Sequence, residues 1–222
     1  MAAAGCIRLG FWQISRLHER RERNALVRSR LDSAEVAFAA RPRDTALARF
    51  RRVRVTGTPD YAHELIYAVR THNGSPGVNF LTPVRVAGSD TAVLVNRGWV
   101  YSPDGSTVDS TKWRERDTTF SGYIEEFPPV AGAAYASRPN VISRLGYPIV
   151  ARTLPYPVAT AYVVMLGDSS MSADRVARLT IPPLDEGPHF SYAVQWFGFA
   201  LVALVGVGFV IRQSCGKRDD TG

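Results

Sequence analysis

Residues 190–211 read FSYAVQWFGFALVALVGVGFVI and carry no charged side chain. A helix of about 22 residues is roughly 33 Å long, which is enough to cross the hydrocarbon core of a bilayer. Tyr192 and Trp196 lie near its beginning, where aromatic side chains prefer the membrane interface. The stretch therefore predicts a transmembrane helix over residues 189–212, followed by a short tail at residues 213–222.

A second apolar segment, IRLGFWQISRL at residues 7–17, lies near the other end of the chain. Few residues precede it and Arg8 interrupts it, so as written it is too short to span a bilayer. We expect either a short peripheral helix or, over residues 1–17, the remnant of a first transmembrane helix that begins upstream of Met1. The charged sequence that follows carries leucine and valine on one stripe and predicts a helical connector over residues 18–48.

The sequence between these segments indicates β-structure. Val53 and Val55 alternate with arginine and threonine, which is typical of a strand with one buried face. Further strands are predicted at Leu65–Thr71, Val78–Ala87, Thr91–Tyr101, Phe120–Glu125, Ile149–Leu154, Ala161–Leu166 and Val176–Ile181, with a turn at His72–Gly77 and a short helix at Asn140–Leu145. Many short strands with glycine and proline turns favour a mainly β domain, an antiparallel barrel or sandwich with some helix, over residues 49–184. Pro182 and Pro183 then separate this domain from the apolar helix.

The composition argues against several classes of function. Lysine and arginine number 27 against 20 acidic residues, a net charge of +7, but lysine occurs only at Lys112 and Lys217. Such a preference for arginine is typical of a GC-rich coding sequence and indicates a bacterial source. The arginines form no stripe interleaved with aromatic residues, so we expect no nucleic-acid partner. No standard catalytic signature is present, and Asp104 before Gly105 indicates a turn, so we expect no enzyme.

The N-terminal segment ends in a motif that combines aromatic and polar side chains. Trp12, Gln13 and Arg16 follow its apolar turns, and Gly10 allows close helix packing. Tryptophan anchors at a membrane interface and arginine reaches from there to water. These residues therefore indicate an interfacial structural element or a surface for a partner.

A second motif, VNRGWV, ends an apolar strand at residues 95–100. Gly98 indicates a bulge or the close approach of another backbone. Arg97 and Trp99 suit two roles that the sequence leaves open. In the first role they contact a partner or an anionic group. In the second they pack at a strand end, with the arginine paired internally.

His189 begins the predicted membrane helix, and Tyr192 and Trp196 follow three and seven residues later, along a similar face. A neutral imidazole nitrogen in this place can ligate a metal or a heme iron, whereas the alternative is an interfacial residue that caps the helix. Gln195 puts an amide inside the apolar helix, where a polar group needs a partner. These residues form the candidate cofactor site, with His189 as the candidate metal ligand and with no candidate catalytic residue.

Four segments occur in a set order: LGFWQISR at residues 9–16, PGVNFLTPV at 76–84, VLVNRGWV at 93–100 and HFSYAVQWFGFA at 189–200. In this order and spacing the chain resembles the surfeit locus protein one family of cytochrome c oxidase biogenesis factors. The resemblance implies two transmembrane helices that flank an extracytoplasmic domain. It also implies the bacterial cell membrane as location, with residues 213–222 as a cytoplasmic tail.

The resemblance further implies a function. Bacterial members of the family are associated with binding heme a and passing it to oxidase subunit I, and their membrane-proximal histidine matches His189. Beside it, Tyr192 and Trp196 are expected to shelter the macrocycle. The other motif residues are expected to serve structure or partner contact; they are Trp12, Gln13, Arg16, Arg97, Gly98, Trp99 and Gln195. We therefore expect an oxidase assembly factor that binds heme a transiently, with subunit I, heme a synthase and the lipid bilayer as partners. A scaffold that stabilises an assembly intermediate without heme is the alternative.

Overall fold

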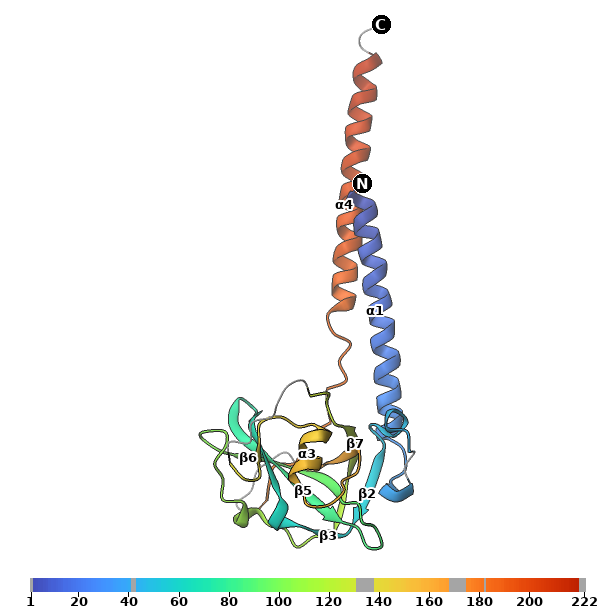
Figure 1. The fold of residues 1–222 in the computed structure, drawn as a ribbon. Coiled ribbons are helices and arrows are strands. Elements are labelled where there is room, and N and C mark those ends of the chain that lie inside the picture. The colour runs from blue at the N-terminus through green and yellow to red at the C-terminus, as the bar shows by residue number, and fades with distance from the viewer. Residues whose placement is uncertain (1, 41–42, 131–137, 168–174, 182, 220–222) are drawn as a thin grey trace. The chain divides into compact units, whose positions relative to one another are not determined.

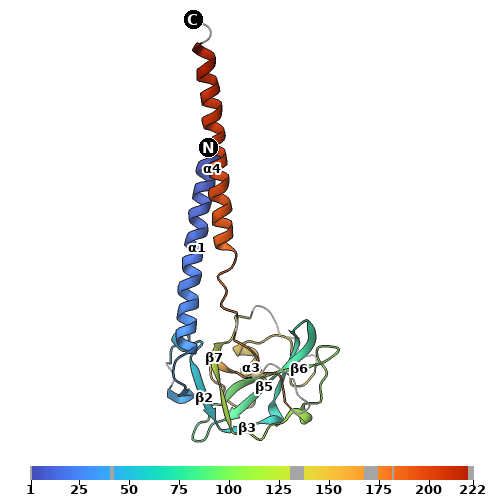
Figure 2. The same ribbon diagram turned by 180° about the vertical axis from the view of Figure 1, so that it is seen from behind.

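The structure, a computed structural model, describes residues 2–40, 43–130, 138–167, 175–181 and 183–219. The chain divides into two compact units, Met1–Arg28 with Pro183–Gly222 and Ser29–Pro182. The first unit is a pair of long helices, and the second is a β-rich domain. Figures 1 and 2 show the chain from opposite sides.

The helix pair consists of α1 (Ala2–Leu31) and α4 (His189–Asp219). The two helices run side by side in opposite directions over part of their length, as both views show (Figures 1 and 2). Among the described residues, His189–Gln213 is the one helical stretch long and apolar enough to cross a membrane. Most of its large apolar side chains are exposed, as on a helix that faces lipid. This stretch supports association of the chain with a membrane.

The N-terminal helix is longer and more continuous than the sequence pattern indicated. α1 passes through residues 17 and 18 without a break and ends at Leu31. The predicted connector over residues 18–48 is therefore helical only in part. It continues into β1 (Val36–Ala37), the 3-10 helix η1 (Phe38–Ala40) and α2 (Thr45–Ala48). Pairing of Val36 with Val53 of β2 outweighs the helical pattern of the local sequence.

Within the described residues, the β-rich domain holds nine strands in one sheet. Besides β1 they are β2 (Arg52–Thr56), β3 (Thr58–Pro59), β4 (Leu65–His72), β5 (Ser75–Arg85), β6 (Val93–Tyr101), β7 (Thr119–Glu126), β8 (Val141–Ile142) and β9 (Ala161–Met165). Between them lie the 3-10 helices η2 (Tyr61–His63) and η3 (Ser110–Trp113) and the helix α3 (Tyr147–Thr153). Three pairs are parallel, β1 with β2, β4 with β8 and β6 with β9. The predicted antiparallel sheet is therefore corrected to a mixed one.

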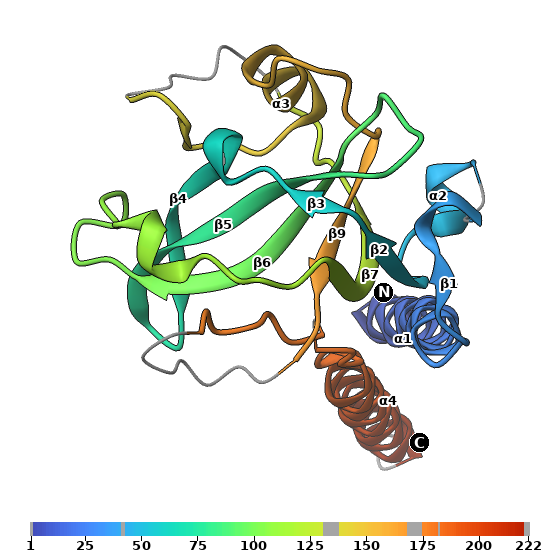
Figure 3. The same ribbon diagram turned by 90° about the horizontal axis from the view of Figure 1, so that it is seen from below.

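The strands close into a ring because residues 52–59, which form β2 and β3, pair with two different strands that the rest of the sheet connects. β2 and β3 are separated only by Gly57, yet β2 pairs with β7 and β3 pairs with β5. Between these two partners the ladder runs β7, β9, β6 and β5, which can be followed in Figure 3. A Cβ at Gly57 would overlap the backbone carbonyl oxygen of Arg85, so only glycine lets the segment change neighbours here. The domain is thus a small barrel with one parallel seam, β6 with β9.

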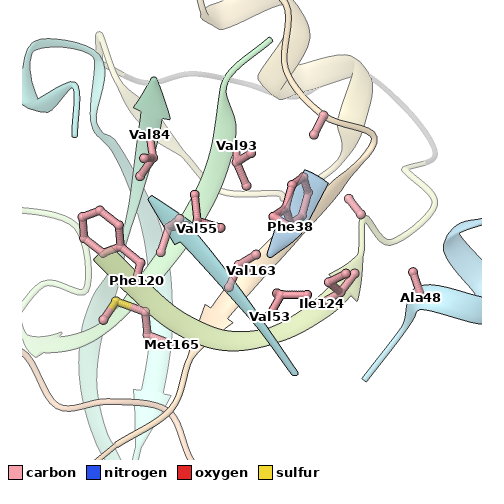
Figure 4. Packing of buried hydrophobic residues seen from close by; sticks show 13 residues of the cluster. Phe38, Ala48, Val53, Val55, Val84, Val93, Phe120, Ile124, Val163 and Met165 are labelled. Carbon is pink, nitrogen blue, oxygen red and sulfur yellow. The ribbon is translucent and has the colours of Figure 1, made fainter. Parts of the chain in front are cut away.

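The interior of the barrel is filled by apolar side chains from β2, β5, β6, β7 and β9. The strands contribute Val53, Val55, Val84, Val93, Val95, Phe120, Ile124, Ala161, Val163 and Met165, and Phe38 of η1 packs against them. Figure 4 shows this cluster. Full burial of each large side chain stabilises the fold by about 1.5–3 kcal/mol. The side chains enclosed by the ring are therefore a main source of the stability of the domain.

The strand predicted at Ile149–Leu154 is wrong, because these residues lie mostly in α3. The β-branched side chains of Ile149 and Val150 favoured a strand in the sequence. Pro148, however, lies in the first turn of the helix, where its missing N–H costs nothing. Both β-branched side chains are buried, so packing outweighs their weak helix propensity.

Two further local predictions differ from the structure. The short helix predicted at Asn140–Leu145 is instead the strand β8, which pairs with Ile66 and Tyr67 of β4 after Asn140 takes a φ of 63°. The strand predicted at Val176–Ile181 forms only isolated bridges, to Trp99 and Leu166. The partners Tyr67 and Trp99 lie far away in the chain, so local sequence patterns do not reveal these pairings.

Candidate functional site

The helix pair brings together the first and the last sequence motif. Gln13 of α1 is buried, and its Oε1 atom is 2.8 Å from the Nδ1 atom of His189, the first residue of α4. One turn before Gln13, Gly10 lies against the Phe197 ring of α4, and a Cβ there would be 2.6 Å from the ring. Close packing at Gly10 therefore holds the glutamine beside the histidine.

This contact fixes the tautomer of His189. The amide oxygen of Gln13 can only accept a hydrogen bond, so the Nδ1 atom carries the proton and donates it. In the neutral imidazole the Nε2 atom then keeps its lone pair, and none of the described residues makes a hydrogen bond with it. A neutral imidazole that is oriented through its other nitrogen is the usual arrangement of a histidine metal ligand.

Aromatic side chains continue from His189 along α4. Tyr192 is 46% exposed and Trp196 is partly buried, and their spacing from the histidine places them along a similar face of the helix. On α1, the exposed Trp12 ring stacks with the guanidinium of Arg16, 5.6 Å from the ring centroid. Tyr192 and Trp196 thus lie about one and two turns along α4 from His189.

Gln195 does not join this group. It is exposed on α4, six residues from His189, and therefore projects from a different face of the helix. Within the described part of the chain, no side chain or backbone group makes a hydrogen bond with its amide. The structure thus separates Gln195 from the histidine that the sequence grouped with it.

A cavity of about 370 Å³ opens beside His189. Its other lining residues are Arg16, Glu19, Arg20 and Arg23 on α1. The Nη1 atom of Arg16 is 2.7 Å from the Oε2 atom of Glu19. Sequence reasoning singled out Arg16 but missed Arg20 and Arg23, although their spacing of three and four residues places all three arginines on one helix face.

The second motif lies inside the β domain. Arg97 of β6 is fully buried, and its Nη2 and Nε atoms are 2.5 and 3.2 Å from the Oε1 atom of Glu64. Its Nε atom also donates to the hydroxyl of Thr82 at 2.7 Å, and its Nη1 atom donates to the carbonyl oxygen of Trp113 at 2.6 Å. Of the two roles that the sequence left open for Arg97, this geometry favours internal pairing.

A second ion pair completes this buried network. The Nη2 atom of Arg178 is 2.7 Å from the Oε1 atom of Glu115, and its Nη1 atom donates to the carbonyl oxygen of Arg97 at 2.6 Å. The Oε2 atom of Glu115 lies 3.6 Å from the Nη1 atom of Arg97. Two arginines and two carboxylates thus balance each other inside the domain. Sequence reasoning missed Glu64, Glu115 and Arg178, because each comes from a different part of the chain.

Gly98 provides the close backbone approach that the sequence indicated. Its φ of 134° lies in the region that favours glycine, and a Cβ would overlap the carbonyl oxygen of Ala177. The next residue, Trp99, exchanges backbone hydrogen bonds of 2.8 and 3.0 Å with Ala177. Trp99 itself is buried, with its ring centroid 5.2 Å from that of His72. This motif therefore fastens the segment around Ala177 to β6.

A larger cavity, of about 610 Å³, opens at one end of the barrel. Most of its lining is apolar, from the ends of β2 and β5, the starts of β6 and β9, and η1. An ion pair between Arg54 and Glu35, 2.5 Å between the Nε and Oε1 atoms, lies in its wall. None of the candidate site residues lines this cavity.

Asp104 is a turn residue, as the sequence indicated. Its carboxylate accepts hydrogen bonds from the backbone and the hydroxyl of Thr107, from the backbone of Ser106 and from the hydroxyl of Ser102. These bonds, chiefly those from Thr107, hold the pKa of Asp104 well below its ordinary value. The carboxylate therefore stays ionised and organises the loop.

We expect Asp104→Asn to lower thermal stability at neutral pH and to lose this effect in acid. Because the folded-state pKa is depressed, the contribution of the carboxylate is complete above the ordinary pKa of about 3.9 and is lost gradually as the pH falls from there through the folded-state pKa. Melting temperatures of both proteins between pH 7 and pH 2 measure this. Asp90→Asn, at an exposed loop position, is the control. A difference between wild type and Asp104→Asn that is as large at pH 2 as at pH 7 contradicts the prediction.

Both helices and the β domain match one protein family. A model of the SURF1 family matches residues 1–201. The chain belongs to the SURF1 family. The SURF1 match includes all four sequence motifs and ends inside α4, so Gln13 and His189 both lie within it.

SURF1 relatives cover most of the chain at low identity. A SURF1-like protein of Mycobacterium tuberculosis is 27% identical over 208 residues, which cover 89% of this chain and 74% of the relative. A SURF1-like protein of Rickettsia felis is 25% identical over 205 residues, 90% of this chain and 88% of the relative. Surfeit locus protein 1 of Gallus gallus is 25% identical over 214 residues, 86% of this chain and 66% of the relative. The family resemblance drawn from the four motifs is thus confirmed.

Proposed function

We propose that this SURF1-family protein is a membrane-anchored assembly factor for cytochrome c oxidase that holds heme a through His189 and assists its insertion into subunit I. One observation carries the proposal. The Nδ1 atom of His189 donates to Gln13, which leaves the Nε2 atom for the iron. The association of the family with oxidase assembly supports the same function.

The residues around His189 fit such a cargo. The macrocycle of heme a is flat and apolar, and Tyr192 and Trp196 provide rings for it to pack on. Each Å² of apolar surface removed from water contributes about 25 cal/mol, so a modest contact supplies several kcal/mol. One histidine ligand at a partly exposed position gives a hold that a partner protein can release. Exchangeable binding of this kind is what delivery requires.

The β domain is the part of the chain proposed to dock oxidase subunit I or heme a synthase. The apolar stretch His189–Gln213 supports a membrane location, which we propose to be the bacterial cell membrane with the β domain on the extracytoplasmic side. His189 begins this stretch and would therefore lie at the membrane surface. A ligand held there is within reach of a membrane-embedded acceptor.

The absorption spectrum of the full-length protein tests the proposal. The protein is co-expressed with the enzymes of heme a synthesis and purified in detergent. We expect a heme a spectrum in the wild type and its loss in His189→Ala. His18→Ala is the matched control, because His18 is an exposed histidine on α1 that does not line the cavity beside His189. The control variant is expected to keep the spectrum.

A second variant tests the role of Gln13. Gln13→Leu removes the acceptor for Nδ1 at similar volume, and loss of such an orienting partner typically weakens ligation by about 10–100-fold. A heme titration of the purified apoprotein measures this. A wild-type protein that binds no heme a would favour the heme-free scaffold. A spectrum unchanged in His189→Ala would overturn the assignment of the ligand.

A further inference from the structure

The cavity beside His189 has an excess of positive charge. Arg16, Arg20 and Arg23 line it together with one carboxylate, Glu19. Arg16 is paired with Glu19 at 2.7 Å, whereas neither Arg20 nor Arg23 has a hydrogen bond or ion pair with another described residue. Three guanidinium groups on one helix face repel each other across spacings of three and four residues. An anion in the cavity would offset this repulsion.

The neighbouring arginine on α1 shows the contrast. The Nε and Nη2 atoms of Arg21 are both 2.8 Å from the carboxylate of Glu186, which lies just before α4. About one turn further along α1, Asn24 donates to the carbonyl oxygen of Asp185 at 2.8 Å. These contacts join α1 to the residues just before α4, and the charges of Arg21 and Glu186 are paired with each other. Arg16, Arg20 and Arg23 take no part in these contacts.

Along the helix pair, a positively charged surface is followed by an apolar one. The arginine cavity lies at the polar end, His189 begins the apolar stretch, and Tyr192 and Trp196 follow within it. A molecule that fits this order carries an anionic group at one end and an apolar body at the other. Arginine side chains at a membrane surface bind phosphate and carboxylate groups through charge-assisted hydrogen bonds.

We propose that this cavity binds the oxyanion of an amphipathic molecule whose apolar part lies along α4. Two sources share this chemistry. One is the phosphate of an anionic phospholipid, which goes beyond the proposed function. The other is the pair of propionate carboxylates of a tetrapyrrole, which rests on the proposed function. Arg20 and Arg23 are the residues that recognise the oxyanion.

The first arm of the test measures the lipid. Full-length protein in a neutral detergent receives phosphatidylglycerol or phosphatidylcholine, and native mass spectrometry measures the lipid retained. We expect the wild type to prefer phosphatidylglycerol and the double variant Arg20→Gln/Arg23→Gln to lose at least about tenfold of that preference. Arg28→Gln, which removes an exposed arginine of α1 outside the cavity, is the control and is expected to behave as wild type.

The second arm measures the carboxylates. Hemin and hemin dimethyl ester share the ring and the iron, but the ester has no free carboxylate. If the cavity takes propionates, the ester binds the wild type about tenfold more weakly, and the double variant treats both alike. If it takes lipid alone, hemin and its ester bind equally while phosphatidylglycerol is retained.

The outcomes separate this proposal from the proposed function. Retention of phosphatidylglycerol that depends on Arg20 and Arg23, in a protein that binds no hemin, supports the oxyanion site and overturns heme binding. Hemin binding that depends on His189, without any effect of the double variant on lipid or ester, overturns the oxyanion site alone. Circular dichroism of the double variant confirms that its helices remain folded.

Discussion

Replacing Arg97 with methionine is expected to destabilise the β domain by about 3–5 kcal/mol, the usual effect of removing one partner of a buried ion pair. The substitution keeps much of the side-chain volume but leaves the carboxylate of Glu64, whose side chain is 2% exposed, without its guanidinium. The hydroxyl of Thr82 and the carbonyl oxygen of Trp113 lose a donor as well. For a domain of this size the melting temperature should fall by roughly 6–20 °C.

Denaturant unfolding of the full-length protein in detergent measures this, with tryptophan fluorescence as the signal. Arg52→Met is the matched control, since Arg52 is exposed on β2, and it should change stability by less than about 0.5 kcal/mol. The double variant Arg97→Met/Glu64→Gln should cost less than the sum of the single changes, because it leaves no unpaired charge. A loss below about 1 kcal/mol in Arg97→Met would show that the network contributes little.

Gly98→Ala should destabilise the same domain by roughly 2–5 kcal/mol, through backbone strain together with steric overlap. Alanine at a φ of 134° is strained, and its Cβ would meet the carbonyl oxygen of Ala177. The segment around Ala177 must then move away, and the two hydrogen bonds with Trp99 are lost. Hydrogen exchange of the Trp99 and Ala177 amides measures this directly and should speed up strongly.

Gly88→Ala separates the two causes of this effect. Gly88 also has a positive φ, 72°, but nothing lies within 4 Å of a Cβ built there. Its substitution therefore introduces strain without overlap and should cost only about 1 kcal/mol. If both variants lose the same stability, the close approach at Ala177 is not what requires glycine at position 98.

Features encoded by neighbouring residues could be predicted from the sequence. The turn predicted at His72–Gly77 is confirmed at its centre, as a two-residue loop between β4 and β5 in which His72 pairs with Ser75; Ser75–Gly77 already belong to β5. Its central residues, Asn73 and Gly74, have φ values of 49° and 79°. Asparagine and glycine adopt such values at low cost, so these two adjacent residues are enough to specify the turn.

Features that depend on distant residues could not be predicted in the same way. The sequence singled out both Gln13 and His189, but no spacing rule connects residues at opposite ends of a chain. Arg97 was likewise singled out, while its partner Glu64 comes from the far side of a hairpin. A side chain can be recognised as unusual from its neighbours in sequence, whereas its partner is set by the packing of the whole domain.

The closed ring of strands makes the order of synthesis matter. Val53 faces Gly122 and Val95 faces Val163, so the first strands of the barrel wait for the last ones to leave the ribosome. A chain that stops before Ala161 has no β9, and the edges of β6 and β7 remain without their partner. Unpaired edges readily join other chains, so such a product is prone to aggregate. A premature stop before Ala161 would thus remove α4 and also leave behind a domain with unpaired strand edges.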